Sequence, residues 1–290
     1  MGKTDRIANK EKRQKEYVKA KVEKSSSKHK MRAARMKYEL DHPEAKAERL
    51  ANNVPETIES KRIYDETMEE PVEDESDTFS SYFDGRPPKV LITTSKKAKK
   101  EGYLLGEQLV DVLPNSEFMK RSLKYEIKDI AKTATKQNYT DILVLNEDKK
   151  KVNGVTFIHL PEGPTMYFSL TSLKLTEEIR NHGRATSHVP ELIMNNFSTR
   201  LGKTVGRMFQ SLFPQQPNFF GRQVVTLHNQ RDYVFFRRHR YIFRNEEKVG
   251  LQELGPQFTL KLKRVQQGIK QELEWERTAK MDVDKKQFYL

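Results

Sequence analysis

The sequence predicts an α/β protein in which two related α/β halves follow a charged N-terminal extension. Three observations lead to this prediction. Strand-like and helix-like apolar patterns alternate after residue 82, a set of apolar positions recurs about 100 residues later, and the first 82 residues are poor in the large apolar side chains that a core needs. The chain has 290 residues and no cysteine, so it is long enough for one large domain or two small ones and forms no disulfide.

The extension, residues 1–82, changes the sign of its charge along its length. Residues 1–37 contain fourteen Lys or Arg and four acids, whereas residues 38–77 contain fourteen acids and four bases. Segments 9–23 and 29–40 are rich in helix formers and are separated by three serines, so we expect an arm that is largely disordered or becomes helical on RNA. Its candidate RNA-binding residues are Lys12, Arg13, Arg32 and Arg35.

Two questions about the extension stay open at this point. The basic part is either an RNA-binding arm or a solvated tail that carries a nuclear import signal. The acidic stretch 56–77 either shields the basic arm or faces a basic protein.

The first half, about residues 83–178, shows a regular succession of elements. A buried strand is predicted first, then two amphipathic helices, then three more strands, which is the order of an α/β half-domain. The predicted ranges are 89–94 for the first strand, 102–113 and 125–137 for the helices, and 141–145, 154–160 and 165–173 for the later strands.

The second half, about residues 188–265, repeats the first. The apolar and glycine positions 105, 106, 109, 112 and 113, and the proline that follows them, recur 100 residues later, and Leu91-Ile92 matches Leu192-Ile193 upstream. Downstream, Gly163-Pro164 and the strand after it match Gly255-Pro256 and its strand. Matches in the same order predict a duplicated α/β unit with a pseudo-twofold relation.

Residues 222–244 contain six arginines interleaved with aromatic and β-branched residues, against the single acid Asp232. This mixture favours a strand pair that binds nucleic acid, most plausibly RNA, because arginine grips phosphate and stacks on bases. We expect a hairpin of strands 223–228 and 233–244; the alternative is a solvated strand end whose arginines cover aromatic rings. The candidate RNA-binding residues are Arg222, Arg231, Arg237, Arg238, Arg240 and Arg244.

A basic helix face precedes this hairpin. Arg200, Lys203 and Arg207 recur at spacings of three and four, which places them on one side of a helix, as an RNA-binding surface or an ordinary solvent-exposed face. The first half has no stretch as rich in arginine as 222–244. We therefore expect one half to carry most of the domain's RNA contacts.

No catalytic, cofactor, metal or membrane signal emerges from the sequence. Gly202-Lys203-Thr204 imitates a phosphate-binding loop, but the glycine that the loop needs at position 197 is Phe197. The histidines do not cluster with carboxylates at metal-ligand spacing, and no apolar run has the roughly 18 residues of a membrane span. In the tail, 269–290, we expect a short helix within 267–277, with Trp275 packing on the domain or on a partner.

Four motifs within about residues 83–268 resemble one family. They are LPEGPT (160–165), HGRATSHVPELIMNNFSTRLGKTVGRMFQSLFP (182–214), GRQVVTLHNQRDYVFFRRHRYIF (221–243) and LGPQFTLKLKRVQQG (254–268). Together they resemble the Brix-domain family of ribosome-assembly factors. Segments 54–67 and 285–290 resemble a member of this family that is associated with the large ribosomal subunit.

The resemblance implies a fold and a set of partners. The fold would be a Brix domain of two α/β halves, each similar to the anticodon-binding domain of class IIa aminoacyl-tRNA synthetases. The family is non-catalytic and nucleolar, so the implied partners are pre-rRNA of the large subunit, a dedicated assembly-factor protein, ribosomal proteins and other large-subunit (pre-60S) factors, without a membrane or small-molecule substrate. The alternative function is a protein–protein scaffold in the pre-ribosome with incidental RNA contact.

Overall fold

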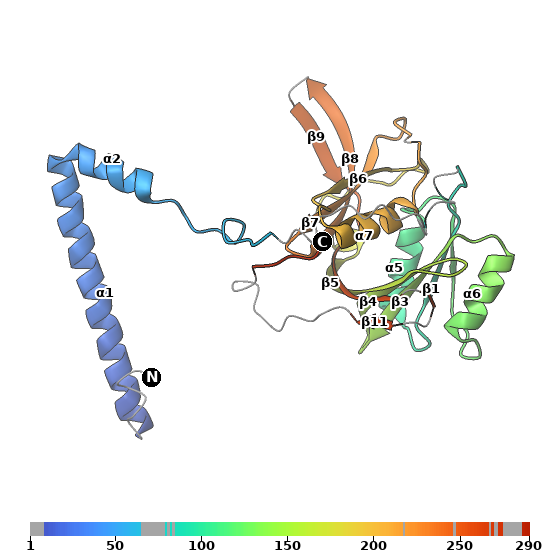
Figure 1. Ribbon diagram of the computed structural model, residues 1–290, viewed down its shortest axis with the longest axis horizontal. Coiled ribbons are helices and arrows are strands. Elements are labelled where there is room, and N and C mark those ends of the chain that lie inside the picture. Colours follow the sequence, from blue (N-terminus) through green and yellow to red (C-terminus); the bar gives the residue numbers. More distant parts are fainter. Residues whose placement is uncertain are drawn as a thin grey trace. The chain divides into compact units, whose positions relative to one another are not determined.

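The fold is that of a computed structural model, which describes residues 9–64, 79, 82, 85–216, 218–245, 248–266, 268–269, 272–274 and 286–290. The chain divides into two units, Met1–Lys61 and Arg62–Leu290. Figure 1 shows the elements of both.

The first unit is helical. Helix α1 (Lys10–Asp41) continues without a break through Ser25, Ser26 and Ser27, and α2 (Pro43–Asn52) follows it. The two helix-forming segments recognised in the sequence, 9–23 and 29–40, therefore belong to one helix. Serine costs roughly 0.5 kcal/mol in a helix interior, which the surrounding lysines, alanines and glutamates offset because they are good helix formers.

Hydrogen bonds at the two ends of α1 define where it starts and turns. Asn9 caps the helix by accepting a hydrogen bond from the Lys12 amide at 3.1 Å. Near the other end, Arg49 of α2 donates to Glu39 of α1 at 2.6 and 3.1 Å. The basic arm is thus a long helix followed by a short one.

The first half of the second unit contains all the elements predicted for it and one more. The additional strand is short and only half apolar, which left no clear sequence pattern. In chain order the elements are β1 (Val90–Thr94), α5 (Lys100–Val110), β2 (Ser116–Met119), α6 (Ile127–Lys136), β3 (Asp141–Asp148), β4 (Lys151–His159) and β5 (Thr165–Lys174), followed by the short helix η2 (Thr176–Glu178).

The second half follows the same plan. Its predicted hairpin is confirmed, with a two-residue turn at Arg231-Asp232, and one strand after the hairpin was missed. The elements are β6 (Glu191–Asn195), α7 (Arg200–Gln210), β7 (Gln223–Gln230), β8 (Tyr233–Asn245), β9 (Lys248–Glu253) and β10 (Gln257–Gln266).

Both halves share one sheet, and its strand order shows the duplication. The order is β2-β1-β3-β4-β5-β10-β8-β7-β6, so β1, β3, β4 and β5 correspond to β6, β7, β8 and β10. The pairs β1–β3 and β6–β7 are parallel, and the remaining corresponding pairs are antiparallel. At the centre β5 and β10 are antiparallel, as a twofold axis between them requires. The predicted pseudo-twofold is confirmed.

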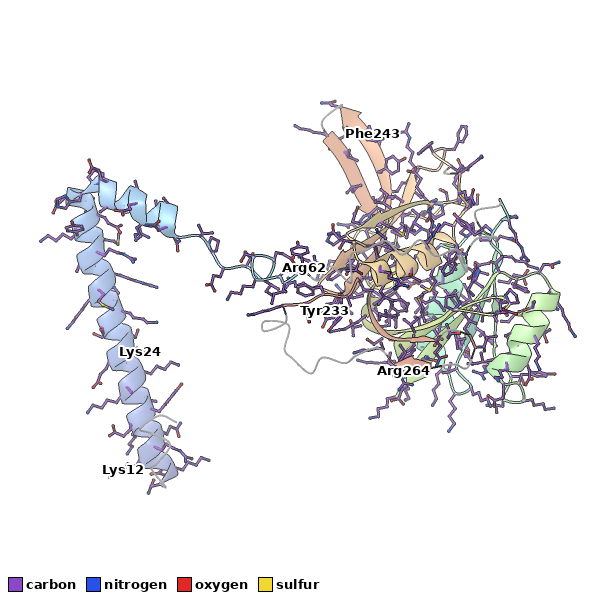
Figure 2. All side chains as sticks on the ribbon, viewed as in Figure 1. Lys12, Lys24, Arg62, Tyr233, Phe243 and Arg264 are labelled. Carbon is purple, nitrogen blue, oxygen red and sulfur yellow. The ribbon has the colours of Figure 1, made fainter. Side chains whose placement is uncertain are left out.

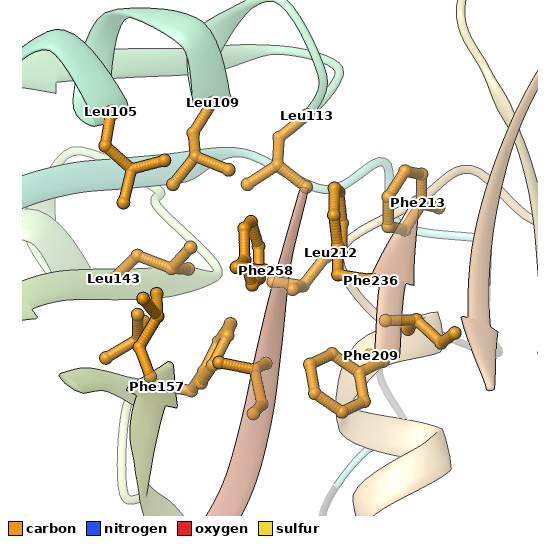
Figure 3. A pocket seen from close by; sticks show the side chains of 14 residues that line it. Leu105, Leu109, Leu113, Leu143, Phe157, Phe209, Leu212, Phe213, Phe236 and Phe258 are labelled. Carbon is orange, nitrogen blue, oxygen red and sulfur yellow. The ribbon is translucent and has the colours of Figure 1, made fainter. Parts of the chain in front are cut away.

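Helices α5 and α7 pack on the same face of this sheet. Leu105 and Leu109 of α5 and Val205 and Phe209 of α7 are at most 4% exposed and belong to one apolar cluster. In Figure 3, leucines of α5 and phenylalanines of the second half surround a cavity of about 30 Å³. Because its lining is entirely apolar, this cavity is a packing void in a shared core, with no polar group to orient a ligand.

Helix α6 covers the opposite face, and only in the first half. Its Ala131 and Ala134 pack in a second apolar cluster with Ile142 and Val144 of β3 and Ile158 of β4. No helix of the described residues stands at the corresponding place between α7 and β7. The two halves therefore differ mainly in how this second face is covered.

One predicted match between the halves is out of register by one residue. Ile92 lies in the α5–α7 cluster and Leu91 in the α6 cluster, but in β6 it is Leu192 that packs against the α5–α7 cluster. Ile193 is 45% exposed on the other face. Ile92 therefore corresponds to Leu192, with the same offset of 100 as the helices, because strand side chains alternate between faces.

The C-terminal tail also differs from the prediction. Glu272–Glu274 form strand β11, which pairs antiparallel with β10, where a short helix was expected. Pairing with β10 supplies these residues with hydrogen bonds from an existing sheet, whereas an isolated short helix is only marginally stable in water. Trp275 and residues 65–77 of the acidic stretch lie outside the described residues.

Candidate nucleic-acid interface

The arm residues predicted to bind RNA all lie exposed on α1. None of the 32 residues of this helix is buried, and Lys12, Arg13, Arg32 and Arg35 are among the exposed ones. In Figure 2 the side chains of α1, Lys12 and Lys24 among them, point outwards around the whole helix. Because this strongly charged helix has no buried residue, charge is the main property that its surface offers.

Helix α7 carries a basic ridge, which we define as Arg200, Lys203 and Arg207. All three are exposed, whereas Val205 and Phe209 on the opposite side of the helix are buried in the core. Thr199 caps the helix by accepting a hydrogen bond from the Gly202 amide at 2.9 Å. The amphipathic pattern therefore fixes the ridge on the outside of the domain, as the spacing predicted.

The six arginines of the stretch 222–244 do not form one patch. They are distributed over both faces and both ends of the hairpin, since Arg231 lies in the β7–β8 turn and Arg244 near the far end of β8. Thirteen residues of extended strand separate these two positions by roughly 40 Å. Each arginine therefore has to be assessed by its own surroundings.

Arg238 is the arginine that the structure removes from the candidate set. It is 2% exposed, and its Nη2 donates to Oε1 of Gln223 at 2.7 Å. Burial lowers the pKa of its guanidinium, and the carboxylate of Asp111 acts in the opposite direction. Because Val225, its partner across the strands, faces the core, Arg238 has to face the core as well. The expectation that it contacts RNA was wrong.

Arg237 and Arg240 lie on opposite faces of β8. The Nη1 of Arg237 donates to the carbonyl oxygens of Phe236 (2.7 Å) and Phe258 (3.3 Å), so this half-buried side chain is held along the sheet. Arg240 is exposed, as are Arg222 before β7 and Arg244 further along β8. Arg240 and Arg244 share a face of the strand, and they are the arginines of β8 that present charge to solvent.

The described residues contain neither a metal centre nor a membrane span. No group of three or more His, Asp or Glu side chains among them is placed to hold a metal ion. Within the same residues, no helix combines the length and the apolar composition needed to cross a membrane.

The comparison with known families decides the assignment. Residues 95–264, which begin directly after β1 and end within strand β10, match the Brix domain. The chain belongs to the Brix-domain family. The match includes the strands from β2 to β9, most of β10, helix α7 and the arginine-rich hairpin.

Relatives extend the similarity beyond the Brix domain. The chain is 55% identical to ribosome production factor 1 of Saccharomyces cerevisiae over 293 residues, which covers 100% of this chain and 99% of that protein. It is 50% identical to the Brix domain-containing protein C4F8.04 of Schizosaccharomyces pombe (98% and 99% covered) and 48% identical to ribosome production factor 1 of Pongo abelii (82% and 71% covered). This relationship supports a role in ribosome biogenesis.

A solved structure is also similar. The crystal structure of a probable ribosomal biogenesis protein from Aeropyrum pernix K1 has a TM-score of 0.46 and 15% sequence identity, and the similarity covers 60% of this chain and 96% of that one. The family assignment rests on the sequence matches.

The sequence did not predict one partly exposed surface of the Brix domain, which we call the open face. It is the face of β6, β7, β8 and β9 opposite to α7, and it includes Ile193, Arg237, Tyr241, Phe243 and Leu251. The alternation of Val249 and Leu251 in β9 was the available sequence signal. The strand has only six residues, which is too short for this alternation to distinguish it from a loop.

Proposed function

We propose that this chain is a non-catalytic ribosome biogenesis factor that binds pre-rRNA in nucleolar precursors of the large subunit and supports rRNA processing and assembly. The observation that carries the proposal is the exposed basic helix α1, which has twelve Lys or Arg, five acids and no buried residue. A polyanion such as RNA neutralises this charge and releases counterions, which favours binding.

The basic ridge on α7 supports the same proposal from within the Brix domain. Its three cations lie on the outside of a helix whose opposite side packs in the core, so the backbone that carries them is already ordered before RNA binds. Arg240 and Arg244 provide two more exposed guanidinium groups on β8, which bind phosphate in a bidentate manner. RNA contacts are thus expected on α1, on the ridge and at these arginines, and mainly in the second half.

The partners follow from the same proposal. In the pre-ribosome the chain contacts pre-rRNA of the large subunit, a dedicated assembly-factor protein, ribosomal proteins and other large-subunit factors. Binding without chemistry fits a surface made of exposed cations, since a catalytic site requires clustered acid, base or nucleophile groups.

The salt dependence of RNA binding tests this proposal. The full chain and a ridge variant, Arg200→Ala with Lys203→Ala and Arg207→Ala, are titrated with a large-subunit rRNA fragment from about 50 to 300 mM salt. The slope of log affinity against log salt is expected to become shallower by roughly 0.7 to 0.9 for each lost phosphate contact. Arg238→Ala is the matched control, since this buried arginine contributes no phosphate contact.

A protein–protein scaffold is the second candidate function, and the open face is the observation that favours it. An unchanged slope in both the ridge variant and a variant with Lys12, Arg13, Arg32 and Arg35 all replaced by Ala would refute RNA binding by these surfaces. It would leave the scaffold as the better description of the chain.

A further inference from the structure

The carboxyl ends of three neighbouring strands in the first half carry a dense group of lysines. Strands β2, β1 and β3 are adjacent and parallel, so the loops that follow them meet at one end of the sheet. We call this the basic end and define it as segments 95–101, 119–126 and 146–151. Together these segments contain ten Lys or Arg and four acids, and eight of their nine lysines are exposed.

We propose that the basic end binds an unpaired segment of RNA, whose phosphates contact the lysines and one of whose bases stacks on the ring of Tyr125. This inference rests on the proposed function, which assigns RNA contacts to α1 and mainly to the second half. It adds an RNA surface to the half in which few contacts were expected.

Contacts between the loops hold the basic end together. Lys96 forms an ion pair with Glu126, which joins the loop after β1 to the loop after β2. Glu147, near the end of β3, accepts hydrogen bonds from the backbone amides of Lys99 at 2.8 Å and of Gly102 at 3.0 Å. Because these two carboxylates are engaged within the basic end, the exposed lysines dominate the charge that it presents to solvent.

Tyr125 places an exposed aromatic ring among these cations. Its side chain belongs to a residue that is 58% exposed. Arg121, whose own side chain is only 6% exposed, braces the loop, since its Nε and Nη2 donate to the carbonyl oxygen of Tyr125 at 3.4 and 3.3 Å. An exposed ring on a braced loop offers a face for a base. Bases within a duplex already stack on their neighbours, so this contact selects an unpaired segment.

The helix that follows β1 shows that these lysines do not serve stability. Lys99 is the N-cap of α5 and its side chain makes no capping hydrogen bond, whereas Thr199, 100 residues later, caps α7. Cations near a helix N-terminus are unfavourable, because the backbone amides there carry partial positive charge. Lys97, Lys99 and Lys100 precede or begin α5, so their charge acts against the helix.

The duplication does not account for the lysines either. The segment of the second half that corresponds to 95–101 is 195–201, and it contains Arg200 as its single cation. An anionic partner accounts for a group of cations that neither the helix nor the repeat requires.

RNA matches the basic end better than an acidic protein does. Each nucleotide brings a phosphate for a lysine and a base for the ring of Tyr125, whereas an acidic peptide brings carboxylates alone. Adjacent strands lie about 4.8 Å apart, so the three loops form a track roughly 10 Å wide across the end of the sheet. Lysines along such a track act as flexible point charges, which suit a backbone that carries a charge at every repeat.

Charge-matched variants of the full chain test the basic end. A single-stranded RNA oligonucleotide of about 20 nucleotides is titrated at about 50 to 300 mM salt. Two site variants and a control each replace two exposed lysines: Lys97→Ala with Lys100→Ala, Lys120→Ala with Lys124→Ala, and, on α6 as the control, Lys132→Ala with Lys136→Ala. The salt slope is expected to become shallower by roughly 0.7 for each lost phosphate contact in the site variants and to stay unchanged in the control. Equal slopes in all three variants would overturn the proposal.

Tyr125 tests the stacking contact separately from the charge. Tyr125→Ala is expected to weaken the affinity for the single strand at least fivefold and to leave the salt slope unchanged, because the ring contacts a base and not a phosphate. Tyr125→Phe keeps the ring and is expected to stay within twofold of the parent chain. A loss for Tyr125→Phe as large as for Tyr125→Ala would refute stacking, and an equal loss on a duplex of the same sequence would refute the preference for unpaired RNA.

Lys99→Thr separates RNA binding from folding. The midpoint of urea unfolding is expected to equal or exceed that of the parent chain, because threonine is a favoured N-cap and the cation at the helix N-terminus is removed. The affinity for the single strand is expected to fall at least twofold. A lower midpoint with unchanged affinity would show that Lys99 serves the fold, and it would overturn the proposal.

The basic-end variants and the variants of α1 and the ridge distinguish this inference from the proposed function. If the slope changes with α1 or the ridge but not with the basic end, the proposed function stands and the inference fails. If it changes with the basic end alone, the inference stands and α1 and the ridge are not RNA surfaces. In cells, a photoreactive amino acid at position 125 of the full chain is expected to crosslink to RNA, and crosslinks to protein alone would overturn the inference.

Discussion

The carboxylate of Asp232 accepts hydrogen bonds from the backbone amides of Tyr289, at 2.7 Å, and of Leu290, at 3.0 Å. Asp232 lies in the β7–β8 turn and is the single acid of the arginine-rich stretch, so its function there is to hold the end of the chain. Phe288 and Leu290 are buried beside it, and the guanidinium of Arg62 lies 5.5 Å from the ring of Phe288. Tyr289 and Leu290 thus pack against the Brix domain at the β7–β8 turn.

Asp232→Asn is expected to lower the free energy of unfolding by about 1 kcal/mol, because the two amides then donate to a neutral acceptor in place of a charged one. Asparagine also tolerates the left-handed backbone that Asp232 adopts, with φ at 64°. The midpoint of urea unfolding measures the change. The exposed Asp148, replaced by Asn, is the control, and equal midpoints for Asp232→Asn and the parent chain would contradict the assigned role.

Replacing either of two glycines of α7 by alanine is expected to change stability, in opposite directions for the two positions. At Gly202 a Cβ would lie 2.6 Å from the carboxyl carbon of Leu290, whereas at Gly206 the nearest atom would be 3.8 Å away. Gly202→Ala should therefore destabilise the chain by about 1–3 kcal/mol through overpacking, and Gly206→Ala should stabilise it by up to about 1 kcal/mol through helix propensity. Thermal unfolding of both variants measures this.

Removal of residues 288–290 provides the control for this pair. Without Leu290 the clash at Gly202 disappears, so most of the loss caused by Gly202→Ala should disappear as well in the shortened chain. A loss that stays the same would show that the close approach of Leu290 is not its cause.

Replacing Arg238 is expected to affect stability, whereas replacing Arg240 is expected to affect RNA binding. Arg238→Ala leaves Oε1 of Gln223 without its donor and opens a cavity, so it should cost about 2–4 kcal/mol of stability and leave the salt slope of RNA binding unchanged. Arg240→Ala should change stability by less than about 0.5 kcal/mol and make the slope shallower by roughly 0.7 to 0.9. Chemical denaturation and RNA titration measure the two effects.

The reverse pattern would contradict the assignment of these residues. If Arg238→Ala changed the slope at unaltered stability, its side chain would have to reach the surface. If Arg240→Ala left the slope unchanged, this exposed guanidinium would make no contact with RNA.

His239 is expected to make stability fall with decreasing pH. Burial lowers its pKa from the ordinary 6.5, although Glu253 acts in the opposite direction, so the unfolded chain binds its proton more readily than the folded chain. The stability that neutral His239 contributes to the fold is complete above pH 6.5, and it is lost as the pH falls below that value. Unfolding of the parent chain and of His239→Gln between pH 7.5 and 5 measures the difference, and the variant should lose less stability than the parent.

Local sequence patterns predicted most elements of the Brix domain but not their contacts. The buried strand Asp141–Leu145 and the stripe Leu105, Leu109, Val205 and Phe209 were recognisable because apolar periodicity reflects which face is buried. The register of Leu192 was not recognisable, since either of two adjacent apolar residues in a strand could be the one on the buried face. The same ambiguity concealed Arg238, because Val234 and Phe236 on its face are no more apolar than Tyr233 and Phe235 on the other.

The sequence by itself determined the duplicated α/β plan, the segregation of charge and the basic ridge on α7, because these depend on periodicity and composition. Only the tertiary structure decided which arginine is buried, that the hairpin ends in a projecting ribbon, that Asp232 holds Leu290, and that no helix of the described residues covers the second half as α6 covers the first. These depend on strand register and on contacts between residues far apart in the chain, which a local pattern does not encode.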